Sequence, residues 1–348
     1  TRLADLNREN DATRANLRRV APKLGGLLGI VADLHASPAF RGKDGLRLRF
    51  IEVVELWWRE WAGDAGAKQV IGKPRVKLVK ELEEAALPVA AVLDALKKSA
   101  APVTILDLCS GKGILAILLA HLVPEDSTSR IFLVDYAWQL EGPIAAKMAI
   151  KPDHLPAANR TARVALEAVK LNLLSSEVDD FISEKCSHTP VLLVGVHLCK
   201  YLSAHAIRLF NTVGCVGQLV LAPCCTPRKG KPPVSVGGTV LDPAVVHAAE
   251  HPYEAWAGML FEAVDTEKKH REVVLMTKES HCCNVFITAT KAQCTLGAVA
   301  KRAAPELSAG RKRRQERRAA RRQAPTEDGL LAGVAGESTG TRDETQAG

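Results

Sequence analysis

The sequence lacks several features that would each indicate a particular class of protein. Its longest unbroken apolar run is the seven residues 114–120, whereas a helix that crosses a bilayer needs roughly 20. We therefore expect no membrane-spanning helix. Nine cysteines include no C-x-x-C pair, which argues against a secreted disulfide framework and against a common type of zinc site. Reduced thiols in the cytoplasm or the nucleus are the expected state, and no internal repeat is present.

Outside residues 301–323, the positive and negative charges of the chain balance. The 348 residues carry a net charge of +8, and residues 301–323 alone contain ten basic side chains against two acidic ones. The run RKRRQERRAARR at 311–322 has no apolar face beyond its alanines, so we expect it to stay out of any core. An RNA-binding arm, a nuclear import signal and a solvated tail without a partner all remain open. Residues 326–348, rich in glycine, threonine, alanine and acids, are predicted to be disordered.

The most informative motif is VTILDLCSGKGILAILLA at 103–120. An apolar strand ends in the acid Asp107, turns through residues 110–113 and enters an apolar helix. Such a unit cradles a nucleotide-type cofactor, because glycines allow close approach of the backbone and the helix N-terminus presents free N–H groups. A second strand at 131–134 ends in Asp135, which lies 22 residues after Gly113. A carboxylate at that place is suited to accept hydrogen bonds from a ribose diol.

The glycine loop alone fits two cofactors. Residues 111–116 also match the G-x-G-x-x-A form of a dinucleotide-binding loop. Asp107 favours S-adenosylmethionine (SAM), because its carboxylate suits the ammonium group of SAM and would repel a pyrophosphate. NAD and an empty structural loop remain the alternatives.

The pattern along the chain predicts three regions. Residues 1–100 are predicted to be helical, with a helix at 76–100 interrupted at Pro88. In the helix RFIEVVELWWREWA (49–62), Ile51, Val54 and Trp58 share a face with Trp61 near it, and we interpret the tryptophans as packing rather than base stacking. From residue 101 to 295 strands and helices alternate, and seven strands with the last two adjacent in sequence predict an α/β, Rossmann-like, doubly wound sheet. A basic and then acidic disordered tail is predicted for 296–348.

Ligands of open α/β sheets bind beyond the carboxyl ends of the strands, and this rule selects the candidate residues. The cofactor-binding candidates are Asp107, Cys109, Ser110, Gly111, Gly113, Asp135 and Asn172, and the catalytic candidates are His197, Cys199 and Cys224.

Their roles stay open. His197 is suited either to deprotonate an acceptor or to fix its loop. One of the thiols Cys199 and Cys224 would attack a pyrimidine while the other assists release, or both are simply buried. A metal cluster of His197, Cys199, Cys224 and Cys225, extended by His281 and Cys282, is a weaker alternative, and we expect no metal. The basic loop at 228–231 (Arg228, Lys229 and Lys231) either clamps phosphates or is solvated.

Three motifs together resemble a known family. LDLCSGKG (106–113), VGVHLC (194–199) and LAPCC (221–225) are similar to the class I SAM-dependent methyltransferase domain of the tRNA acceptor-stem 2′-O-methyltransferases and of related uncharacterised methyltransferase-like proteins. The resemblance covers 101–291. It implies a Rossmann-like fold, SAM as methyl donor and a nucleic acid, tRNA above all, as acceptor.

Carried over residue by residue, Asp107, Gly111 and Gly113 match the cofactor loop and Asp135 matches the ribose-binding acid. His197 with Cys199 matches the H-x-C element, and Cys224 with Cys225 matches the paired cysteines. The sequence departs from the family where Cys109 replaces the first loop glycine and Lys200 replaces a glycine. It also lacks the zinc-finger modules that those enzymes carry upstream.

We therefore expect a SAM-dependent methyltransferase that acts on RNA and holds it through the basic tail and the 228–231 loop. The alternatives are a non-catalytic RNA-binding scaffold, an NAD-dependent oxidoreductase, and a methyltransferase of a protein or small molecule.

Overall fold

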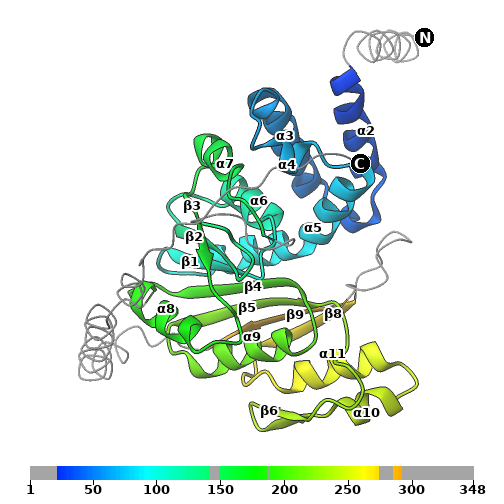
Figure 1. Ribbon diagram of the computed structural model, residues 1–348, viewed down its shortest axis with the longest axis vertical. Helices are drawn as coiled ribbons and strands as arrows, with labels where there is room; N and C mark the ends of the chain where they lie inside the picture. Colours follow the sequence, from blue (N-terminus) through cyan, green and yellow to red (C-terminus); the bar gives the residue numbers. More distant parts are fainter. Residues whose placement is uncertain (1–21, 141–148, 187, 274–284, 292–348) are drawn as a thin grey trace, which may run out of the picture. The chain divides into compact units, whose positions relative to one another are not determined.

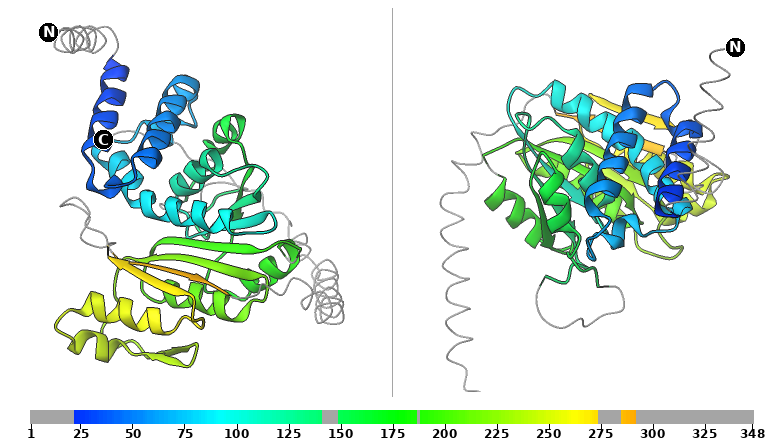
Figure 2. Two further views of the ribbon diagram at one scale, coloured as in Figure 1. Left: turned by 180° about the vertical axis from the view of Figure 1, so that it is seen from behind. Right: turned by 90° about the horizontal axis from the view of Figure 1, so that it is seen from above.

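The computed structural model describes residues 22–140, 149–186, 188–273 and 285–291 (Figures 1 and 2). Its main feature is a seven-stranded sheet with the order β3-β2-β1-β4-β5-β9-β8. Five strands are parallel, and β9 runs antiparallel to both of its neighbours. The strands are β1 (Val103–Leu108), β2 (Thr128–Asp135), β3 (Leu166–Lys170), β4 (Val191–Leu198), β5 (Val216–Pro223), β8 (Lys269–Val273) and β9 (Val285–Thr290). This strand order confirms the predicted class I methyltransferase fold.

Both faces of the sheet are covered, which explains why its central strands are continuously apolar. All six residues of β1 are buried, because successive side chains of a strand point to opposite faces. Ile105 belongs to one hydrophobic core and its neighbour Leu106 to the other. The same alternation in β2 and β4 extends each core across the sheet.

Two groups of helices form these covers (Figure 1). One face packs against α2 (Pro22–Ala36), α3 (Asp44–Trp61), α5 (Arg75–Lys97), α6 (Ile114–Leu122) and α7 (Leu155–Thr161). The other packs against α8 (Glu177–Lys185), α9 (Tyr201–Thr212) and α11 (Pro252–Glu262). The short elements are η1 (Pro38–Phe40), α4 (Lys68–Ile71), α10 (Pro243–Ala248) and the hairpin of β6 (Val234–Val236) and β7 (Thr239–Leu241). The N-terminal helices therefore share a core with the sheet.

The tryptophans of α3 pack inside the protein, as predicted. Trp57 and Trp61 are fully buried, and their stacked rings lie 5.0 Å apart. Both rings also lie against His121 of α6. The predicted face was wrong in one position, since Trp57 and not Trp58 occupies its centre, and Trp58 is only partly buried. Helix α3 contacts α2, α5 and α6, so side chains on more than one side of the helix are buried.

Helix α5 is continuous, so the predicted interruption at Pro88 is wrong. A proline inside a helix removes one hydrogen bond, here the one that would end on the carbonyl of Glu84. Eleven residues of α5, including Pro88, are buried, and the helix contacts α6, β4 and β5. The burial of these side chains stabilises the helix by more than the lost hydrogen bond at Pro88 destabilises it.

The predicted basic and acidic tail lies outside the described residues, as do residues 1–21 and the pair Cys282–Cys283. Among the described helices, none is long and apolar enough to cross a membrane.

Candidate active site

A cleft of about 900 Å³ opens between the glycine loop and helix α5. The predicted residues Asp107, Cys109, Ser110, Gly111, Gly113 and His197 all line it. We call the β1–α6 loop with Asp107 and Asp135 the floor, and α4 with the first half of α5 the wall. The floor comes from the carboxyl ends of β1 and β2, as the rule for open sheets predicts.

Asp135 ties the two strand ends together. Its Oδ2 accepts a hydrogen bond from the backbone N–H of Gly111 at 3.0 Å, and its Oδ1 accepts one from Ala137 at 2.8 Å. The carboxyl group is 8% exposed. Each oxygen has a second lone pair, so the carboxylate is positioned to accept further hydrogen bonds from a ligand.

Asp107 is a buried carboxyl with an unusually high pKa. It is 3% exposed, and no hydrogen-bond partner for its Oδ2 exists in the described part of the chain. Burial, opposed by a hydrogen bond from the backbone of Ala116 and aided by the nearby Asp135, raises the pKa of this carboxyl to about 8. A buried carboxyl without a cation is costly to ionise. Asp107 thus lacks a cation partner among the described residues, which a ligand would supply.

The loop between these acids has a left-handed backbone at three positions. Gly111 and Gly113 have φ of 54° and 74°, and a Cβ on Gly113 would lie 2.1 Å from Leu133 Cδ2. Cys109 adopts φ 54° although it is not glycine, which explains why the family pattern has glycine there. The amides of Ser110 and Gly113 bond to Val134 O at 3.2 Å and Ser110 O at 2.8 Å. These amides shape the loop.

His154 supports the loop from outside and was missed by the sequence analysis. Its Nε2 lies 2.8 Å from the carbonyl oxygen of Lys112, and its ring stacks on Trp138 at 6.0 Å. Burial lowers the pKa of this histidine, so the neutral ring donates to the carbonyl. No motif marks it, because it joins the loop across 42 residues of sequence.

The wall is rich in lysine. Lys68, Lys77 and Lys80 line the cleft from α4 and α5, Lys73 lines it from the turn between these helices, and Lys112 lines it from the glycine loop. Lys73 Nζ lies 2.5 Å from both carboxylate oxygens of Glu81, and Lys80 Nζ lies 3.8 Å from Glu84. The other three lysines are exposed and form no ion pair with another described residue.

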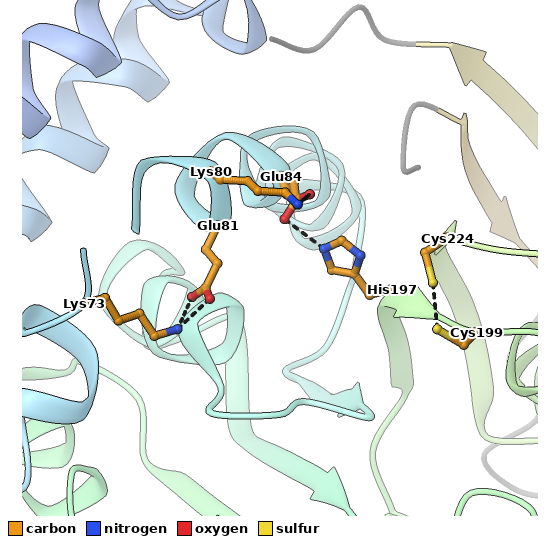
Figure 3. A network of polar contacts seen from close by, with 7 residues as sticks. All are labelled: Lys73, Lys80, Glu81, Glu84, His197, Cys199 and Cys224. Carbon is orange, nitrogen blue, oxygen red and sulfur yellow. Dashed lines mark hydrogen bonds and ion pairs between the residues drawn. The ribbon is translucent and has the colours of Figure 1, made fainter. Parts of the chain in front are cut away.

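His197 joins the wall to the end of β4 (Figure 3). Its Nε2 lies 2.8 Å from Oε2 of Glu84, a carboxylate that is 5% exposed. A hydrogen bond with Cys224 and then the bond with Glu84 raise the pKa of His197 to about 9. The ring is therefore protonated at neutral pH, which favours the loop-fixing role over that of a base. Glu84 was missed because 113 residues separate it from its partner.

The structure also brings the candidate cysteines together. Sγ of Cys199 lies 2.8 Å from Sγ of Cys224, which is 3.8 Å from Sγ of Cys225. Burial is the main cause that raises the pKa of Cys199 and of Cys225. Neither thiol is poised as a nucleophile, because the thiolate is the reactive form.

Several predicted residues are not part of the cleft lining. Asp135, Cys199 and Cys224 lie behind or beside it, and Asn172 and the 228–231 loop are also outside it. Asn172 is exposed after β3, and its Oδ1 accepts a hydrogen bond from the N–H of Leu174 at 3.0 Å. The 228–231 loop presents exposed basic side chains and is held by hydrogen bonds from Tyr201 to Pro232 O at 2.6 Å and from His247 to Pro227 O at 2.9 Å. Neither lines the cleft.

One family profile matches part of the chain. Residues 77–228 match the sequence profile of a family described as "Methyltransferase domain". The matched range begins inside α5 and ends after Cys225, so it includes both the floor and Glu84. No curated protein matches the chain significantly.

Similar solved structures are distant in sequence. A SAM-dependent methyltransferase from Agrobacterium tumefaciens is 9% identical with a TM-score of 0.34, and the match covers 61% of this chain and 63% of that one. The CurJ carbon methyltransferase is 13% identical at 0.37, with 81% and 71% covered. The magnesium protoporphyrin IX methyltransferase from Synechocystis is 11% identical at 0.34, with 69% and 96% covered. These likenesses are too weak to indicate an acceptor.

The floor fits SAM by its own chemistry. Asp107 Oδ2 and Ser110 Oγ are buried polar atoms without a partner among the described residues, and the ammonium of SAM supplies the cation that Asp107 lacks. A Cβ on Gly111 would meet nothing within 4 Å, so the backbone is open to a ligand there. The strand order, the family match and this cradle identify residues 77–228 as a SAM-dependent methyltransferase domain.

Proposed function

We propose that the chain transfers a methyl group from SAM to RNA, with tRNA as the first candidate. The observation that carries the proposal is the lysine wall, because it places unpaired positive charge beside the cofactor cradle. Phosphates of an RNA backbone are the natural partners of such a surface. The basic segment 301–323 and the 228–231 loop are proposed as further contacts.

Within this proposal, different residues bind the cofactor and the acceptor. SAM supplies an activated methyl group. Asp135 accepts hydrogen bonds from the ribose hydroxyls and holds the loop by Gly111, while Asp107 faces the ammonium. Lys68, Lys77 and Lys112 hold the acceptor's phosphates, and His197 is fixed at the edge of the cleft by Glu84. Positioning two bound reactants in line is the main contribution that such a site makes.

Removal of the three unpaired lysines tests the acceptor. The full chain with Lys68→Gln, Lys77→Gln and Lys112→Gln should bind a tRNA pool about tenfold more weakly than wild type. The plot of log affinity against log salt should also be shallower by about two to three. Lys98→Gln is the matched control, since Lys98 is an exposed lysine at the opposite end of α5. Equal affinities in all three proteins would refute the role of the wall.

Methyl transfer separates the remaining alternatives. With methyl-labelled SAM, label in the RNA fraction supports the proposal, and label in the protein or small-molecule fraction would redirect it to another acceptor. RNA binding without any binding of S-adenosylhomocysteine would favour the scaffold. Deletion of residues 301–348 should weaken RNA binding and its salt dependence without changing cofactor binding. Activity in the cytoplasm or nucleus stays a prediction.

A further inference from the structure

The three cysteines beside the cleft come from two neighbouring strand ends. Cys199 follows β4, and Cys224 and Cys225 follow β5, in register where Leu198 pairs with Pro223. The three Sγ atoms lie within 4.8 Å of one another. In a tetrahedral zinc site with Zn–S bonds of about 2.3 Å, sulfur atoms lie about 3.8 Å apart, which is the distance between Cys224 and Cys225. Sγ of Cys199 lies closer to Cys224, at 2.8 Å, so these two sulfur atoms would move apart by about 1 Å to share a tetrahedral ion.

His197 is the candidate fourth ligand, although its ring nitrogens do not lie within 4.8 Å of all three sulfur atoms. Its Nε2 bonds to Glu84 (Figure 3), and the ring also hydrogen-bonds to Cys224. Because Nε2 is held by Glu84 at 2.8 Å, the other nitrogen is left to serve the cysteine cluster. Histidines that bind a metal through one nitrogen usually donate the other N–H to a carboxylate. Glu84, buried on α5, supplies that carboxylate.

The backbone around Cys199 is bent in a way that local sequence does not favour. His197 and Lys200 have φ of 63° and 56° although neither is glycine. Each such residue costs on the order of 1–3 kcal/mol, and such strain gathers at functional sites. The N–H of Lys200 donates to the carbonyl of Cys225 at 3.3 Å, which joins the two loops. The bends turn the side chains of 197 and 199 toward the pair that follows β5.

We propose that Cys199, Cys224, Cys225 and His197 bind one Zn²⁺ in a closed, four-coordinate structural site, with Glu84 as the positioning residue for His197. Thiolate and imidazole ligands select zinc and disfavour Mg²⁺ and Ca²⁺. On binding, the thiol protons and one imidazole proton pass to solvent. The ion would fix the ends of β4 and β5 at the edge of the cleft. The proposal is independent of the acceptor.

Metal content and cobalt spectra test this site on the full chain. Metal-free protein should take up one Zn²⁺ per chain, and Co²⁺ in its place should give thiolate-to-cobalt charge transfer and the intense d–d bands of tetrahedral coordination. Cys199→Ser and Cys224→Ser should each lose both signals, whereas Cys109→Ala, a cleft cysteine outside the cluster, should keep them. Glu84→Gln should keep one zinc but bind it at least about tenfold more weakly.

Three results would overturn the proposal. They are the absence of stoichiometric Zn²⁺ in wild type, a cobalt spectrum that Cys199→Ser leaves unchanged, and a disulfide between Cys199 and Cys224 that persists with Zn²⁺ present. Where the serine variants do not fold, counting reactive thiols in wild type decides. Zn²⁺ should protect three thiols per chain from a thiol reagent, and unchanged reactivity would contradict the site.

Discussion

The floor and the wall of the cleft are built from different chemistry. The floor has two buried carboxyl groups and a loop with left-handed glycines, and burial raises the pKa of Asp107 to about 8. The wall has exposed lysines on α4 and α5. A buried carboxyl without a cation on the floor, beside exposed lysines on the wall, is suited to two ligands of opposite local charge. This difference is the basis of our proposal that the cofactor lies on one side and a phosphate-bearing acceptor on the other.

The two sides also differ in how far they are local in sequence. Asp107, the loop and α6 are consecutive, so one motif specifies them. The pair of His197 and Glu84 joins residues 113 apart, and only the packing of α5 on β4 brings them together. A local element is readable from sequence, whereas a contact made by tertiary packing is not.

The largest effect should come from Asp135. Asp135→Ala removes the acceptor that holds the N–H groups of Gly111 and Ala137 and that we propose binds the ribose. Two lost charged hydrogen bonds should weaken S-adenosylhomocysteine binding about 100-fold, as measured by calorimetric titration. Glu125→Ala, the loss of an exposed acid after α6, is the control. An unchanged affinity in Asp135→Ala would remove the floor from cofactor binding.

The raised pKa of Asp107 should make SAM binding depend on pH. Below its pKa of about 8 the free carboxyl is protonated, and the ammonium of SAM must displace that proton. Affinity should then rise up to about tenfold per pH unit toward pH 8 and level off above it. Titrations in buffers of different ionisation enthalpy would detect the released proton.

Adenosine, which lacks the ammonium, should show no such dependence, and neither should Asp107→Asn. The folded protein also holds a proton here that the unfolded chain loses near pH 4. The contribution of Asp107 to stability should therefore fall as the pH rises from about 4 to 8. A rise over that range in wild type relative to Asp107→Asn would contradict the assignment.

Cys109 offers a smaller effect on stability. Its left-handed backbone, at φ 54°, costs a non-glycine residue about 1–2 kcal/mol. Cys109→Gly should therefore raise the free energy of unfolding by about 1 kcal/mol relative to Cys109→Ala, which keeps the strain. Urea unfolding of both variants measures the difference. If alanine proved as stable as glycine, the backbone at 109 would be relaxed.

The smallest effect concerns the ion pair on the wall. Glu81→Gln releases Lys73 from a contact at 2.5 Å and should tighten RNA binding about threefold by adding one free charge. Glu60→Gln makes the same charge change at the exposed pair with Arg59 on α3 and should have no effect. Weaker binding in Glu81→Gln, measured by fluorescence anisotropy, would place the RNA elsewhere.

The sequence predicted the elements that local pattern determines. Strand β1, the loop and the number of strands in the main sheet follow from runs of apolar residues and from turn chemistry, whereas the order of the strands across the sheet is seen only in the structure. The interruption predicted at Pro88 was wrong because the burial of α5 stabilises the helix by more than one lost hydrogen bond costs. Asn172 was chosen by position after a strand, yet its side chain bonds to the next turn. Glu84, His154 and the wall lysines carry no motif, since exposed lysines on a helix resemble any solvated face.

Titration of S-adenosylhomocysteine into the full chain and into the variant with glutamine at 68 and 77 tests the division of the cleft most directly. The account predicts saturable binding in the micromolar range, equally tight in both proteins, because the floor alone holds the cofactor. No saturable binding to wild type would contradict the cofactor site. Binding lost together with the lysines would contradict the separation of floor and wall.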